Sequence, residues 1–150
     1  MAPPTATHQF ILFELSLTIG TFIKNNKGSC QVALAPFAVF LNDDNQNYVE
    51  PDLSVICNLS KIDEKGCHGA PDWIIEIVSP ASRKMDYLLK LFKYRSAGVR
   101  EYWIVDIAKN RITVYNFNHD YSIEEYSFTD TVKAGIYEDL SIDFSEINIL

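Results

Sequence analysis

The sequence predicts an α/β (α+β) domain in which helices flank a mixed β-sheet. An apolar run over Trp73–Val78, interrupted only by Glu76, indicates a strand that is buried on both faces. A helical pattern over residues 82–97 follows it, and residues 102–105 form a second apolar strand. A strand, a helix of this length and another strand indicate a right-handed crossover between parallel strands. The 150 residues fit one domain with a sizeable core.

The first part of the chain predicts one helix and three short strands. Residues 8–24 carry apolar side chains near helical spacing. Residues 30–41 are rich in Val, Ala, Leu and Phe, and Pro36 divides them into two short strands joined at a bend. Residues 42–47 are polar and predict a turn. Another apolar strand is expected over residues 53–57.

The remaining chain predicts a polar loop, the crossover helix and a hairpin. The loop covers residues 58–70. Ser82 is a suitable N-cap for the helix, and Gly98 a suitable stop. Residues 111–117 and 121–128 resemble the two strands of a hairpin, and the remainder is too mixed to assign. The apolar stripe of the helix has i, i+3, i+4, i+7 spacing and consists of Met85, Leu88, Leu89 and Phe92.

The charge of the chain is unevenly distributed. A net charge of −7 argues against a protein that coats nucleic acid through a general basic surface. Residues 83–100 nevertheless hold six basic side chains against one acid, whereas residues 112–150 hold one lysine against eight acids. One face can therefore be favourable for phosphate. The sequence has no uninterrupted run of 18 apolar residues and no signal-peptide pattern, so no membrane partner is expected.

The three cysteines form an odd count without the spacing of a disulfide framework. This predicts reduced thiols in a cytoplasmic protein. Cys57, Cys67 and His68 do not match a usual zinc-binding spacing, so a zinc site is not favoured.

Glu76 is the residue most out of keeping with its surroundings. A carboxylate rarely enters an apolar strand unless a cation or a hydrogen-bond donor compensates it. The alternative to a functional role is a bond from a helix N-terminus or an arginine. Strand alternation places Glu76 on one face with Asp72 and Val78, and puts Trp73, Ile75 and Ile77 on the other.

Two further residues complete a candidate site. Asp52 follows Pro51 at the start of a neighbouring strand, and paired carboxylates on adjacent strands suit a hard divalent cation. Lys90 lies one turn after Asp86 on a helix that packs back on its own sheet, so Lys90 could reach the end of the Glu76 strand. The alternative for Lys90 is an exposed ion pair with Asp86.

The order of these motifs closely resembles the Uma-two family of putative restriction endonucleases, within the PD-(D/E)xK nuclease superfamily. The resemblance runs from His8 and Gln9 to about residue 117. It implies a restriction-endonuclease-like core and a domain that lacks the family's preceding N-terminal segment. Its motifs are Pro51-Asp52, Glu76-Ile77-Val78-Ser79-Pro80, Asp86, Lys90, Tyr94 and residues 97–106.

The resemblance also implies an activity and roles for residues. It implies a DNA endonuclease that uses Mg²⁺, with Mn²⁺ as a substitute, held by Asp52, Glu76 and the Ile77 carbonyl. Val78 stands where the superfamily's lysine usually does, which makes Lys90 the candidate catalytic cation. The supporting residues would be Asp86, Tyr94 and Ser79.

The basic segment is expected to meet the DNA backbone through Arg83, Lys84 and Lys93. A catalytically silent module that binds DNA or protein is the competing hypothesis, and the sequence leaves a homodimer open.

Overall fold

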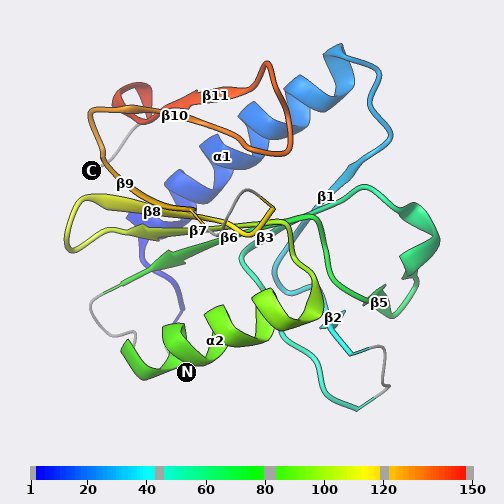
Figure 1. Ribbon diagram of the computed structural model, residues 1–150. Helices are drawn as coiled ribbons and strands as arrows, with labels where there is room; N and C mark the ends of the chain where they lie inside the picture. Colours follow the sequence, from blue (N-terminus) through cyan, green and yellow to red (C-terminus); the bar gives the residue numbers. More distant parts are fainter. Residues whose placement is uncertain (1–2, 43–45, 80–83, 119–121, 148–150) are drawn as a thin grey trace.

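The computed structural model describes residues 3–42, 46–79, 84–118 and 122–147. A six-stranded sheet lies between helices α1 and α2, as Figure 1 shows. This arrangement confirms the predicted fold class. The strands of this sheet are β1 (Gln31–Leu34), β3 (Leu53–Ile56), β6 (Trp73–Val78), β7 (Glu101–Asp106), β8 (Arg111–Asn116) and β9 (Ser122–Ser127).

The sheet is mixed and has the order β1-β3-β6-β7-β8-β9. The two central strands, β6 and β7, are parallel, and helix α2 (Lys84–Ala97) connects them. The other neighbours are antiparallel, including the predicted hairpin of β8 and β9. The predicted crossover is therefore correct, and the crossover strands lie in the middle of the sheet, where both faces are covered.

Helix α1 (Ala6–Asn25) covers one face of the sheet. Thr5 caps its N-terminus by accepting a hydrogen bond from the His8 N–H at 3.2 Å. The helix is long and apolar enough to cross a membrane by length and composition. One side of it packs into the main core of this domain, however, through Ile11, Leu12, Leu15, Ile19 and Ile23.

Helix α2 covers the opposite face, but the predicted apolar stripe does not face the sheet. Leu88, Leu89 and Phe92 are exposed, and the side chain of Met85 lies outside the described residues. The helix instead turns Tyr94 fully inward, with Leu91 packed partly against the same cluster. The stripe prediction is wrong because Glu76 places a carboxylate on this face of the sheet, and hydrogen-bond donors cover it.

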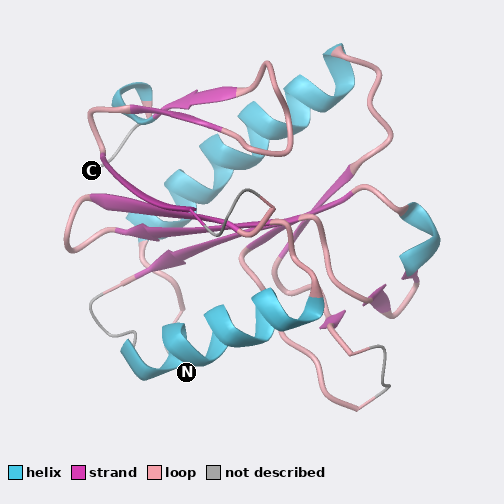
Figure 2. Ribbon diagram, in the orientation of Figure 1, coloured by secondary structure: helices cyan, strands magenta, loops and turns pink. Residues whose placement is uncertain are grey.

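The predicted polar loop over residues 58–70 contains regular structure instead. It forms a 3₁₀ turn (Leu59–Lys61), β4 (Ile62–Asp63) and β5 (Gly66–His68). These strands join β2 (Val39–Phe40) in a small sheet of order β2-β5-β4, visible in Figure 2. The reason is local packing: a buried cluster of Val39, Ile56 and Cys67 holds this sheet against the main one.

The C-terminal segment packs on the α1 side of the main sheet. It forms β10 (Thr131–Lys133), β11 (Ser141–Asp143) and a 3₁₀ turn (Phe144–Glu146). Val132, Ile142 and Phe144 bury their side chains in the same core as α1. The acidic residues of this region lie on elements whose apolar side chains point inward, which explains how an acidic segment can close a core.

A buried carboxylate, Glu101, attaches this segment to the sheet. Its Oε1 accepts hydrogen bonds from the N–H groups of Gly135 at 2.8 Å and Ile136 at 3.0 Å. Its Oε2 accepts a bond from Trp103 Nε1 at 2.6 Å. Burial raises the pKa of Glu101, although all three donors favour the ionised form. Glu101 is therefore a structural residue that connects β7 to the turn after β10.

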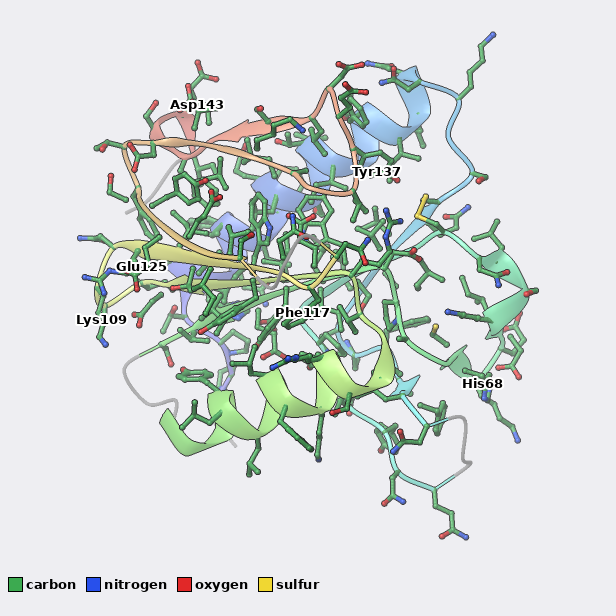
Figure 3. All side chains as sticks on the ribbon, viewed as in Figure 1. His68, Lys109, Phe117, Glu125, Tyr137 and Asp143 are labelled. Carbon is green, nitrogen blue, oxygen red and sulfur yellow. A yellow bond between two sulfur atoms is a disulfide. The ribbon has the colours of Figure 1, made fainter. Side chains whose placement is uncertain are left out.

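The prediction of reduced cysteines is wrong, because Cys30 and Cys57 form a disulfide, drawn in yellow in Figure 3. The β1–β3 register pairs Gln31 with Ile56, which makes Cys30 and Cys57 the next opposed pair. They are 27 residues apart in the sequence, so no local pattern indicates the pairing. Disulfides are rare in the cytosol, so the cysteines no longer support a cytoplasmic location.

We expect alkylation of the unfolded protein to label only Cys67 without a reductant, and all three cysteines after reduction. Mass spectrometry measures the number of labels. The Cys30→Ser/Cys57→Ser variant should lose about 3–4 kcal/mol of unfolding free energy in a denaturant titration, because the bond closes a 27-residue loop. Cys67→Ser is the control for the labelling, since it leaves the disulfide intact and should give no label without a reductant. Three labels without a reductant would contradict the pairing.

Candidate active site

Glu76 lies in the middle of the sheet with both carboxylate oxygens hydrogen-bonded. Glu76 is only 4% exposed. Oε1 accepts a bond from Tyr94 OH at 2.8 Å, and Oε2 accepts one from Tyr102 OH at 3.0 Å. Lys90 Nζ lies 3.2 Å from each of the two oxygens. These three donors compensate the buried charge, in place of the helix N-terminus or arginine that the sequence left open.

The donors are held by the parallel crossover. Tyr102 is on β7, directly beside β6, whereas Lys90 and Tyr94 project from one side of α2 at i, i+4 spacing. The two tyrosine rings pack edge to face with centroids 4.8 Å apart. Burial and then the negative charge of Glu76 raise the pKa of both tyrosines, so both stay protonated hydrogen-bond donors. Tyr94 thus fits the predicted supporting position, and Tyr102 is an additional member.

Asp52 lies where the pairing of β3 with β6 ends. Leu53 pairs with Ile75, so Asp52 and Glu76 are the next residues in register. Asp52 Oδ2 accepts a hydrogen bond from the Ile77 N–H at 2.8 Å. Because the N–H and C=O of a strand residue point to the same side, the Ile77 carbonyl is also directed toward Asp52.

His8 is a site residue to which the sequence assigns no role. Its Nε2 lies 3.3 Å from Asp52 Oδ2, and only 12% of its side chain is exposed. The first turn of α1 therefore reaches the site from the opposite side to α2. The only signal in the sequence was the position of His8 at the start of the family resemblance, because 44 residues separate it from Asp52.

The predicted metal and catalytic residues meet in one pocket of about 150 Å³. Among the described residues, no group of three or more His, Cys, Asp and Glu side chains is arranged to hold a metal ion. Two carboxylates and one carbonyl nevertheless fit Mg²⁺, which retains several waters and needs only one or two carboxylates. We call this the active-site pocket, and its lining is Glu50, Asp52, Glu76, Ile77, Val78, Tyr87 and Lys90.

The other predicted residues lie around this pocket or outside the described region. Ser79 lines a neighbouring groove of about 420 Å³, and Lys93 lines another of about 310 Å³. Arg83 lies outside the described residues, as do the side chains of Lys84 and Asp86. Orientation of Lys90 by Asp86 therefore stays a prediction, whereas the contact of Lys90 with Glu76 is observed.

The weak zinc hypothesis is not supported by the arrangement of its residues. Cys57 is bonded to Cys30, and the Cys67 thiol lies 3.5 Å from the carbonyl of Gly69. His68 Nε2 lies 2.9 Å from Asp63 Oδ2. These side chains are thus engaged with different partners.

The mixed sheet with a helix on each face has a restriction-endonuclease-like fold. A crystal structure described as "a putative nuclease belonging to DUF820 from Anabaena variabilis ATCC 29413" matches with a TM-score of 0.76 and 21% identity. The match covers 97% of this chain and 82% of that one. The family described as "Uma2: Putative restriction endonuclease" matches residues 1–145. The chain belongs to the Uma2 family, which confirms the resemblance seen in the motifs. No curated protein matches it.

Proposed function

We propose that this protein is a metal-dependent endonuclease that hydrolyses phosphodiester bonds in DNA. The observation that carries the proposal is the meeting of Asp52, Glu76 and Lys90 in one pocket. The family supplies the class of enzyme, and the pocket supplies groups suited to its chemistry. A bound Mg²⁺ or Mn²⁺ would polarise the phosphate and lower the pKa of a water molecule. Asp52, Glu76 and the Ile77 carbonyl would hold it.

Lys90 is placed to supply positive charge at the phosphate. Its side chain lines the active-site pocket and is 39% exposed, and its ammonium contacts Glu76. The ion pair with both Glu76 oxygens holds it in one position before substrate arrives. A fixed cation of this kind stabilises charge that develops on a phosphoryl group during attack. Val78, on the strand itself, is aliphatic and cannot take that role.

A catalytically silent module is the second candidate, and one observation favours it. Both oxygens of Glu76 already accept hydrogen bonds, so the buried carboxylate is compensated without a metal ion. Such a site could be maintained for stability alone. The two candidates differ in whether a divalent ion binds to Asp52 and Glu76.

We expect crystals soaked in Mn²⁺ to show anomalous density within about 2.6 Å of Asp52 and Glu76. Calorimetric titration should show that Asp52→Asn weakens Mn²⁺ binding, because the amide lacks the negative charge of the carboxylate. The amide oxygen can still accept the hydrogen bond from the Ile77 N–H. Glu124→Gln, an exposed change on β9, is the matched control and should bind as the wild type does. Density elsewhere, or equal affinity in Asp52→Asn, would favour the silent module.

A further inference from the structure

A groove beside the active-site pocket is lined by two exposed aromatic side chains. Its volume is about 310 Å³, and its lining includes Tyr48, Val49, Phe92 and Lys93. We call it the Phe92 groove. We propose that it binds an unpaired nucleobase of the DNA strand whose phosphate occupies the active-site pocket. This inference rests on the proposed function and makes single-stranded or locally unpaired DNA the substrate class.

Two exposed aromatic rings line the groove. Phe92 is 70% exposed and Tyr48 is 55% exposed, although both side chains are large and apolar. The Tyr48 ring packs on Phe40 with centroids 5.6 Å apart, and Phe40 in turn stacks on His68 at 5.0 Å. Tyr48 is therefore supported from behind while its outer surface is accessible. Every nucleobase has a π-face, and stacking on an aromatic side chain contributes about 1–3 kcal/mol per base.

The groove is adjacent to the active-site pocket, because two segments of the chain line both of them. Val49 lines the groove, and the next residue, Glu50, lines the pocket. On α2, Lys90 belongs to the pocket and Lys93 to the groove. Three residues of helix span about 4.5 Å. A strand with its phosphate at Lys90 can therefore bring an adjacent base to Phe92.

The charge of the protein favours a short contact over a long duplex interface. The net charge is −7 and most basic side chains near the site lie in residues 83–100, so an extended basic surface for a long duplex is not expected. Lys90 lines the pocket and Lys93 lines the groove, so positive charge is present at both. Stacking supplies affinity that needs no further phosphate contacts. A base in a duplex is already stacked and paired, so only an unpaired or extruded base can enter.

The test measures DNA binding without cleavage. Fluorescence anisotropy with EDTA present compares a labelled single-stranded oligonucleotide with the same sequence as a duplex. The wild type should bind the single strand more tightly. Tyr48→Ala and Phe92→Ala should each weaken single-strand binding by about fivefold or more, the lower limit for one lost stacking contact. Phe92→Trp should restore the affinity. Leu89→Ala should not change it, because Leu89 is exposed on the same helix but does not line the groove.

Three results would overturn the proposal. The first is wild-type affinity in both alanine variants, and the second is no preference of the wild type for the single strand. The third comes from sedimentation equilibrium: if Phe92→Ala and Leu89→Ala both convert a dimer to a monomer, the exposed face of α2 binds a second copy. The two proposals fail separately. If DNA binding depends on the groove but no DNA is cleaved in Mn²⁺, the proposed nuclease activity is wrong. If the alanine variants bind and cleave DNA as the wild type does, the proposed role of the groove is wrong.

Discussion

Replacing Lys90 by alanine is expected to lower the rate of DNA cleavage by about 10²-fold or more, as the loss of other groups that stabilise a transition state does. Lys90 Nζ lies 3.2 Å from both Glu76 oxygens, which places it at the metal-binding carboxylate that we propose. No lysine is present on β6, whose sequence is WIIEIV. The measurement is single-turnover cleavage at saturating DNA and Mn²⁺.

Lys93→Ala is the matched control for this variant. Lys93 is on the same helix one turn later, exposed, and lines the Phe92 groove instead of the active-site pocket. Its loss should weaken DNA binding and reduce the slope of log K against log salt by about one. Its single-turnover rate at saturation should not change. Equal cleavage by wild type and Lys90→Ala at saturating DNA and metal would show that Lys90 is not catalytic.

The Lys90 variant needs a check on folding, because Lys90 also compensates a buried charge. In Lys90→Ala the Glu76 carboxylate retains Tyr94 and Tyr102 as donors but loses its cation. Circular dichroism and the melting temperature show whether the protein is folded at the assay temperature. Lys90→Arg is a second variant, because arginine keeps a positive charge beside Glu76 but has a different shape. A folded Lys90→Ala with normal Mn²⁺ binding and slow cleavage would separate the chemical role from the structural one.

Replacing Glu101 by alanine is expected to destabilise the protein by roughly 3–5 kcal/mol. The change removes the acceptor for two backbone N–H groups, of Gly135 and Ile136, and for the indole N–H of Trp103. Each buried donor without a partner costs about 1–3 kcal/mol. The melting temperature should fall by about 10 °C, at about 2–4 °C per kcal/mol for a domain of this size. Differential scanning calorimetry measures it.

Two variants make this test specific. Glu124→Ala removes an exposed carboxylate on β9 and should change stability little. The stability of Glu101→Gln should lie between those of the wild type and Glu101→Ala. Its amide oxygen can accept hydrogen bonds from the backbone, but its NH₂ group faces the Trp103 indole donor. Burial raises the pKa of Glu101, so the ionised form is disfavoured in the fold. The advantage of the wild type over Glu101→Gln should therefore shrink as the pH rises through that pKa. A melting temperature unchanged in Glu101→Ala would contradict the structural role.

The central crossover could be predicted from the sequence because its signals are local. The apolar run of β6, the helical spacing of α2 and the apolar run of β7 each report on neighbouring residues. The single carboxylate in β6 was equally visible, since burial of a charge requires compensation wherever the strand lies. Asp52 followed from its position at the start of the adjacent strand. The candidate site was thus predictable in its carboxylates and in the helix that supplies Lys90.

What only the tertiary structure decided depends on contacts between distant residues. His8 against Asp52, Tyr102 against Glu76, and Cys30 bonded to Cys57 follow from strand order and register, which short-range periodicity does not contain. The orientation of α2 shows the same limit. Its apolar stripe predicts one buried face, but compensation of Glu76 turns Lys90 and Tyr94 inward and leaves Phe92 exposed. Satisfying a buried charge outweighs burying part of an apolar stripe, because an uncompensated carboxylate costs more than exposed hydrocarbon.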